Sequence, residues 1–127
     1  MSTVRPGGLP APLLVSASLV AVEGLLFLLY GVAVLASTSV EWASVAIASG
    51  AFFTGWGAGL LLLARELGRG RAWTRSPVVL AQLLHLGVAW NFRAGDTTWM
   101  AVVGAGVAVL ALVGIFHPAS IEALAEE

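Results

Sequence analysis

Four long apolar runs, separated by short polar segments, limit this chain to few possible folds. The runs cover residues 13–36, 43–64, 77–92 and 99–116. A helix that crosses a bilayer needs about 20 mostly apolar residues. The first two runs reach this length, and the residues before the other two extend them to 75–92 and 97–116. Since 59% of the residues are hydrophobic and only 10% are charged, the sequence predicts four transmembrane helices.

The first run has an alternative interpretation as a cleaved signal peptide. Arg5 precedes it, and Val34–Ser37 loosely resembles a cleavage site. The apolar core of a signal peptide spans about 7–15 residues, whereas this run is much longer and contains Glu23. The sequence therefore favours a retained membrane-spanning helix.

The segments outside the runs complete the predicted domain plan. Residues 1–12 are rich in proline and glycine, which predicts a flexible N-terminal lead. Residues 13–116 form the predicted transmembrane domain, and residues 117–127 form a short cytoplasmic tail that begins beside Pro118. The expected fold is all-α, a four-helix transmembrane bundle with up-down-up-down connectivity.

The arginines predict the orientation in the membrane. Most of them precede the first helix or lie between the second and third, namely Arg5, Arg65, Arg69, Arg71 and Arg75. Arg93 alone lies in the other set of loops. Because positive loops stay on the cytoplasmic side, both termini are predicted to be cytoplasmic in a protein of the plasma membrane. The tryptophans fit interfacial positions in this frame, with Trp42, Trp90 and Trp99 at the outer ends and Trp73 at the inner end.

Small residues recur at helical spacing in two of the predicted helices. In the second helix, Gly50 belongs to one row, and Gly55 and Gly59 belong to the row beside it. In the fourth helix, Gly104 and Ala108 are spaced in the same way. Small residues at this spacing let helix backbones approach closely in lipid. The rows predict close packing, either within one bundle or between copies in a homo-oligomer.

Glu23 lies inside the first apolar run and is the most informative polar residue. At about 1.5 Å per residue, Glu23 lies ~15 Å from the inner end of its helix, and His85 and Trp56 each lie ~12 Å from theirs. Gln82 precedes His85 by one turn on the same helix face. The sequence therefore predicts that Glu23, Trp56, Gln82 and His85 share a depth and form a proton or ligand site.

Two interpretations of Glu23 remain open. A charged carboxylate at the bilayer centre costs at least about 2.5 kcal/mol, so we expect the side chain to face the bundle interior. Desolvation favours the neutral form of a buried carboxyl group, and proton-coupled transporters use such groups, here with His85 as a partner. Alternatively, a static hydrogen bond from Glu23 to His85 or to the Trp56 indole fixes the register of the helices.

The composition argues against several kinds of chemistry. The chain has no cysteine and only two histidines, one of them at position 117, so no metal or redox site has a recognisable spacing. The glycines of Gly55–Gly59 lie inside an apolar helix, where packing explains them better than phosphate binding. The net charge of -1 argues against a nucleic-acid partner. We expect neither catalytic residues nor a metal or other cofactor.

The segment "RAWTRSPVVLAQLLHLGVAWNF", Arg71–Phe92, followed by a fourth helix and "HPASIEAL", resembles a family of small, uncharacterised integral membrane proteins of actinobacteria. The resemblance runs from about the second helix to the tail. It implies four helices and a membrane location, without an assigned activity. The position of His85 is usually apolar in that family, which counts against a proton pair with Glu23.

Glu23 also resembles the membrane glutamate in the first helix of the small multidrug resistance family, which has four short helices. Only Glu23 matches by position, and the aromatic and glycine pattern of that family's third helix is missing here. The resemblance implies a proton-linked role for Glu23 alone.

Two functional hypotheses follow from the sequence. The leading one is a small, non-enzymatic accessory or scaffold protein that binds lipid, another membrane protein or itself as a homo-oligomer. The alternative is a proton-coupled small-molecule transporter that works as a dimer around Glu23. A transporter requires a water-accessible cavity at Glu23, whereas a scaffold requires none.

Overall fold

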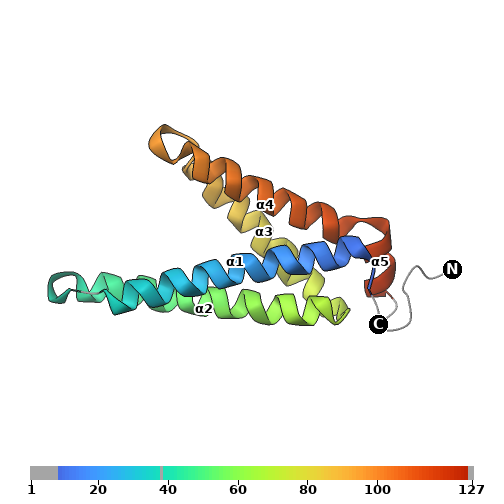
Figure 1. Cartoon of the computed structure of the whole chain (residues 1–127), viewed down its shortest axis with the longest axis horizontal. Coiled ribbons are helices and arrows are strands. Elements are labelled where there is room, and N and C mark those ends of the chain that lie inside the picture. The colour runs from blue at the N-terminus through green and yellow to red at the C-terminus, as the bar shows by residue number, and fades with distance from the viewer. Residues whose placement is uncertain (1–8, 38, 126–127) are drawn as a thin grey trace.

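The computed structural model describes residues 9–37 and 39–125, and all regular structure in these ranges is helical (Figure 1). Four long helices are followed by a short fifth one: α1 (Ala11–Ala36), α2 (Ala43–Gly68), α3 (Arg75–Asn91), α4 (Thr98–Phe116) and α5 (Pro118–Ala125). Short 3-10 turns precede three of them: η1 (Val40–Trp42), η2 (Ala72–Thr74) and η3 (Gly95–Thr97). The predicted all-α class is confirmed for the described residues.

Two helix ends differ from the predicted bounds. α1 starts at Ala11, inside the predicted lead of residues 1–12, because Pro12 is tolerated in the first turn of a helix. The remainder of that lead up to residue 8 lies outside the described residues. α2 continues to Gly68, past its predicted end. The chain then turns at Gly70, whose φ of 77° is a left-handed conformation that favours glycine.

The end of the chain, predicted as a short tail, contains the helix α5. Pro118 starts this helix, since a residue in the first turn has no helical partner for its N–H. The Ser120 hydroxyl donates a hydrogen bond to the carbonyl oxygen of Gly114 in α4, at 2.6 Å. Leu124 is buried. These contacts fold α5 back onto the ends of α1 and α4.

The four long helices form two antiparallel hairpins, α1–α2 and α3–α4 (Figure 1). The hairpins meet at the end that holds the start of α1, the loop between α2 and α3, and α5, and they diverge toward the other end (Figure 1). We call these the closed end and the open end. α1 packs against both α2 and α4, whereas α2 makes few contacts with α3. The arrangement is therefore more open than a closed four-helix bundle.

The main cluster of buried apolar side chains explains this shape. Its members come from the closed-end halves of the four long helices and from α5: Leu13, Ala17, Val20, Leu60, Ala64, Leu67, Val78, Ala81, Ile115, Ala123 and Leu124. The hydroxyl of Ser16, also at this end, donates to the carbonyl oxygen of Ala111 in α4, at 2.8 Å. The open-end halves contribute no buried residue to this cluster. The partly buried Phe27 packs against it from that side, and beyond Phe27 the two hairpins lack a shared core.

Glycines allow α1 and α2 to approach closely. A Cβ atom built on Gly57 would lie 2.6 Å from the carbonyl oxygen of Gly24, and one built on Gly24 would lie 2.9 Å from that of Gly57. Further along, Gly31 faces the backbone of Thr54, and a Cβ on Gly50 would lie 3.1 Å from the Gly31 oxygen. The two backbones are thus in direct contact, the geometry that small residues permit in membranes.

The neighbouring row of α2 does not take part in this contact. A Cβ atom on Gly55 or Gly59 would meet no atom within 4 Å. Their predicted role in packing within one chain is therefore wrong, because the helix turns about 100° per residue and the face that meets α1 carries Gly57 instead. A Cβ on Gly104 would lie 4.0 Å from that of Ala89, so this residue makes only an ordinary contact between α4 and α3.

Three helical segments are long and apolar enough to cross a membrane: Ala11–Ala36, Val40–Gly68 and Gly95–Phe116. α3 has 17 residues, or about 25 Å at ~1.5 Å per residue, slightly less than the ~30 Å of a hydrocarbon core. Many large apolar side chains on the long helices are exposed, with Leu26 at 62% and Val102 at 66%. Such extensive apolar exposure is typical of a surface that contacts lipid. These features indicate a membrane protein.

Candidate functional site

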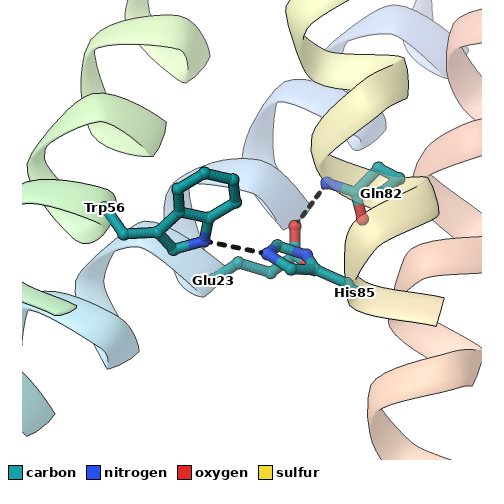
Figure 2. Close-up of polar contacts among 4 residues, drawn as sticks. All are labelled: Glu23, Trp56, Gln82 and His85. Atoms are coloured by element: carbon teal, nitrogen blue, oxygen red, sulfur yellow. Dashed lines mark hydrogen bonds and ion pairs between the residues drawn. The ribbon is translucent and has the colours of Figure 1, made fainter. Parts of the chain in front are cut away.

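Four polar side chains from three helices meet near the middle of α1 (Figure 2). Glu23 comes from α1, Trp56 from α2, and Gln82 and His85 from α3. We call these residues the Glu23 cluster. Glu23 is only 8% exposed and Gln82 is fully buried. The His85 side chain is 10% exposed, and Trp56 is half-buried. The cluster follows the buried apolar core on its open-end side and joins the two hairpins.

Three hydrogen bonds hold the cluster together, and Figure 2 shows the Gln82–Glu23 and Trp56–His85 bonds. The Gln82 side-chain Nε2 donates to Glu23 Oε1 at 2.7 Å. His85 Nδ1 lies 2.9 Å from Glu23 Oε2. The indole Nε1 of Trp56 donates to His85 Nε2 at 3.1 Å. Each carboxyl oxygen of Glu23 therefore has a partner on α3, and the second ring nitrogen of His85 has a partner on α2.

The Trp56 bond fixes the tautomer of His85. An indole N–H can only donate, so Nε2 of His85 must present a lone pair to it. A neutral imidazole carries its single proton on one nitrogen, which must then be Nδ1. The Nδ1–H group consequently donates to Glu23 Oε2. Glu23 thus accepts on both oxygens, as an ionised carboxylate does, and an imidazolium at His85 is incompatible with the Trp56 bond.

The carboxylate is the centre of the connection between the hairpins. A charged group in apolar surroundings is costly unless hydrogen-bond donors satisfy it. Glu23 receives one donor on each oxygen, and charge-assisted bonds of this kind are about twice as strong as neutral ones. Both donors belong to α3, so the bonds tie α1 to the second hairpin at the level where the shared apolar core ends.

Gln82 retains one unused polar atom. Its Oε1 is buried and has no hydrogen-bond partner within the described residues. Turning the amide by 180° would bring this oxygen against Glu23 Oε1, and two acceptors would then face each other. The carboxylate therefore sets the orientation of the Gln82 amide. A donor in place of Glu23 Oε1 would allow the opposite orientation.

Aromatic rings cover the open-end side of the cluster. The centroid of the Phe27 ring lies 5.3 Å from that of the His85 ring. Phe27 also stacks on Phe53, with their ring centroids 5.8 Å apart. Phe52 stacks on the Trp56 indole at 6.1 Å. Phe27 was not predicted as part of the site, although its position four residues after Glu23 places it on the same helix face. The rings hold His85 and Trp56 in the orientations that their hydrogen bonds require.

The structure brings together the residues that the sequence placed at one depth. Glu23, Trp56, Gln82 and His85 are linked in one series of hydrogen bonds. Of the two partners considered for Glu23, the structure shows His85, and the Trp56 indole bonds to the other ring nitrogen of His85. Within the described part of the chain, no group of three or more histidine, aspartate or glutamate residues could hold a metal ion. In the arrangement described the cluster acts as a fixed polar link, and it can take up a proton only if the bond from Trp56 to His85 Nε2 breaks.

The tautomer of His85 gives a first testable prediction. In ¹⁵N NMR of histidine-labelled protein at neutral pH, we expect the His85 ring to carry its proton on Nδ1. Trp56→Phe removes the indole donor, and the proton should then distribute between both nitrogens. Trp73→Phe, remote from the cluster, is the control and should change nothing. A wild-type proton on Nε2 would contradict the arrangement.

Comparison with protein-family models, with curated proteins and with solved structures finds no match to this chain. The resemblances to the actinobacterial membrane proteins and to the small multidrug resistance family therefore stay predictions. The geometry of the Glu23 cluster and the arrangement of the two hairpins are the basis for any functional conclusion.

Proposed function

We propose that this chain is a multi-pass protein of the plasma membrane with four spanning helices and both termini in the cytoplasm. The arginines support this placement. Arg65, Arg69, Arg71 and Arg75 lie at or next to the loop between α2 and α3, at the closed end, whereas Arg93 lies at the open end. By the positive-inside rule the closed end faces the cytoplasm. Arg5, which the sequence assigns to the same side, lies outside the described residues.

The exposed tryptophans support the same placement. Trp42, Trp90 and Trp99 are 64%, 65% and 67% exposed at the open end, and Trp73 is 54% exposed at the closed end. Indole rings prefer the interfaces between hydrocarbon and water. Trp42, Trp90 and Trp99 at one end and Trp73 at the other thus support an interface at each end of the long helices.

Cysteine labelling tests the orientation. The sequence contains no cysteine, so in each single-cysteine variant any labelling of the protein comes from the introduced residue. We expect Ser39→Cys and Ala94→Cys, in the open-end loops, to react with a membrane-impermeant maleimide in intact cells. Arg69→Cys should react only after the membrane is permeabilised. The reverse pattern would place the closed end outside.

The function we propose is that of a small accessory or scaffold protein, without enzymatic activity, that binds another membrane protein or lipid. The saturated hydrogen bonding of Glu23 is the observation that supports this function over transport. Both carboxylate oxygens are used in joining the hairpins. Two surface grooves, of about 350 and 360 Å³, are lined by other residues, and Glu23 lines neither. A fixed polar link suits a scaffold better than a binding site for a transported substrate.

The open-end halves of the hairpins offer the surface for a partner. They lack a shared core, and aromatic side chains there are exposed, with Tyr30 at 57% and Phe52 at 60%. Helices in lipid associate by packing and not by a hydrophobic driving force, so a helix of another protein that fits between diverging hairpins would bind there. The homo-oligomer remains a second form of the same proposal.

Photo-crosslinking in intact membranes tests this proposal. A photoreactive amino acid replaces Tyr30 or Phe52 at the open end, or Leu62 in the closed-end half of α2 as the matched control, which is 52% exposed. We expect Tyr30 and Phe52 to give a discrete protein adduct that Leu62 does not give, and purification through the partner should recover this chain. Adducts with lipid alone at all three positions would overturn partner binding at the open end.

A second candidate function is proton-coupled small-molecule transport by a dimer. The contact between Glu23 Oε2 and His85 Nδ1, at 2.9 Å, favours it, because the two groups can share one added proton once the Trp56 indole releases His85 Nε2. The test is proton flux into liposomes that hold a pH-sensitive dye and the purified protein. Transport predicts flux that Glu23→Gln abolishes, whereas a scaffold predicts the flux of empty liposomes. Flux in wild type with loss in Glu23→Gln would reverse our order of preference.

A further inference from the structure

A groove on the α3–α4 hairpin lies apart from the Glu23 cluster. Its volume is about 360 Å³, and the residues that line it are Arg75, Ser76, Val79, Leu80, Leu83 and Phe116. The groove is shallow and open at the surface. Two polar residues lie at one end of the lining, and apolar residues make up the rest.

Arg75 forms the polar end of the groove and is held in place by an aromatic ring. It is the first residue of α3 and is half-buried. Its guanidinium carbon lies 5.3 Å from the centroid of the Phe116 ring, a cation–π contact. Within residues 9–37 and 39–125, no carboxylate forms an ion pair with Arg75. The cation therefore faces the groove, and no anion of the described residues pairs with it.

The apolar part of the groove runs along α3 away from Arg75. Val79, Leu80 and Leu83 follow Arg75 on the helix, and the eight-residue step to Leu83 covers about 12 Å at ~1.5 Å per residue. Leu80 and Leu83 are 59% and 54% exposed. The groove thus begins at a cation near the end of the helix and continues as an apolar surface toward the middle of the hairpin.

We propose that this groove binds one anionic phospholipid of the inner leaflet, with its phosphate at Arg75 and one acyl chain along Leu80 and Leu83. The inference rests on the membrane placement under the proposed function, in which Arg75 lies at the cytoplasmic interface. A guanidinium matches the oxygens of a phosphate through two parallel hydrogen bonds. Ser76 also lines the groove, and its side chain carries a further hydrogen-bond donor. The cytoplasmic leaflet is rich in negatively charged lipids.

The second surface groove differs in the features that this proposal uses. It lies between α1 and α2, has a volume of about 350 Å³, and has Arg65 in its lining. Arg65 is exposed, and no aromatic ring in the described residues holds its guanidinium group. We therefore expect the preference for anionic lipid to depend on Arg75 and not on Arg65.

Native mass spectrometry of the full chain, released from mild detergent with phosphatidylglycerol or phosphatidylcholine, tests the site. Wild type should retain one phosphatidylglycerol molecule in preference to phosphatidylcholine. Arg75→Gln should weaken that binding at least about tenfold, the effect of losing one charge-assisted contact. Arg93→Gln is the matched control, because the Arg93 guanidinium carbon also lies over an aromatic ring, 4.0 Å from the Trp90 centroid, at the opposite end.

A second variant tests whether the acyl chain of the lipid contributes to binding in addition to its headgroup. Leu83→Trp fills the apolar part of the groove and leaves Arg75 in place, so phosphatidylglycerol binding should fall while the melting temperature stays near that of wild type. Glycerol 3-phosphate, which has no acyl chain, should not compete for the site. Equal competition by glycerol 3-phosphate would show a free-phosphate site and overturn the proposal. Loss of the lipid preference in Arg65→Gln but not in Arg75→Gln would do the same.

Flotation with phosphatidylcholine vesicles shows whether the membrane placement or only the lipid site is wrong. If the protein does not float with the vesicles, the proposed membrane placement is wrong, and so is the lipid site that rests on it. A chain that floats but shows no preference for phosphatidylglycerol overturns the lipid site alone. A chain that floats, and loses its preference only in Arg75→Gln and Leu83→Trp, supports the site.

Discussion

Replacing Gly57 by alanine is expected to push α1 and α2 apart. The added Cβ would lie 2.6 Å from the carbonyl oxygen of Gly24 and would also collide with the backbone nitrogen and Cα of Leu28. These are backbone atoms of a helix, so no side-chain rotation relieves the collision. Overpacking of this kind costs about 1–3 kcal/mol. Thermal unfolding in detergent should show a clear loss of stability relative to wild type.

Two other glycines of α2 provide the matched controls. A Cβ on Gly55 or Gly59 meets no atom within 4 Å, so alanine at either position should leave the melting temperature unchanged or raise it slightly, since alanine favours helix. If this row contacts a second copy of the chain, the same changes should alter the elution volume. Equal melting temperatures of Gly57→Ala and Gly59→Ala would contradict the finding that α2 meets α1 through the face that carries Gly57.

The helices and their approximate bounds follow from local sequence. Apolar runs of membrane length, prolines and glycines act within a few residues, so they mark helices without knowledge of the partner. Pro118, for example, ends α4 and also starts α5. The continuation of α2 to Gly68 was missed, because charged residues outside the hydrocarbon can extend a helix that the apolar pattern no longer marks.

The rotation of the helices could not be predicted in the same way. α2 has small residues on several faces, so the pattern allowed Gly50, Gly55 and Gly59 equally well as packing positions. The structure selects Gly50 and Gly57 because these meet glycines of α1, and this choice depends on atoms far apart in the chain. The divergence of the hairpins is likewise set by where the shared core ends.

The depth of the candidate site in the membrane was predictable, but the pattern of its hydrogen bonds was not. The fixed rise per residue of a helix places Glu23, Trp56 and His85 at one level whatever their rotation. Which atom bonds to which depends on helix rotation and on rotamers. The sequence therefore left open whether Glu23 would bond to His85 or to the Trp56 indole. The structure pairs Glu23 with His85, and the indole bonds to the other ring nitrogen of His85, a bond that was not predicted.

Glu23→Leu is expected to produce the second large effect. The leucine accepts no hydrogen bond, so the Nδ1–H of His85 and the amide of Gln82 lose their acceptor in a buried place. Interhelical bonds in membranes contribute about 1–2 kcal/mol, and leaving buried donors unpaired costs about 1–3 kcal/mol. The melting temperature should fall, and the two hairpins should separate further at the open end.

Glu23→Gln tests whether geometry or charge at this position holds the hairpins together. A glutamine has one acceptor and one donor group, so its oxygen can take the His85 Nδ1–H while its NH₂ faces Gln82. The Gln82 amide can then turn by 180° and use its Oε1, the atom that has no partner in wild type. Every bond between the hairpins would be kept without a buried charge. The free energy of unfolding of Glu23→Gln should therefore lie within about 0.5 kcal/mol of the wild-type value and well above that of Glu23→Leu.

The double variant Glu23→Gln, Gln82→Leu is the control. It removes the amide that must turn, so its melting temperature should be lower than that of Glu23→Gln. If Glu23→Gln unfolds as readily as Glu23→Leu, the cluster depends on the carboxylate charge, and the hydrogen-bonded link proposed for the scaffold is wrong.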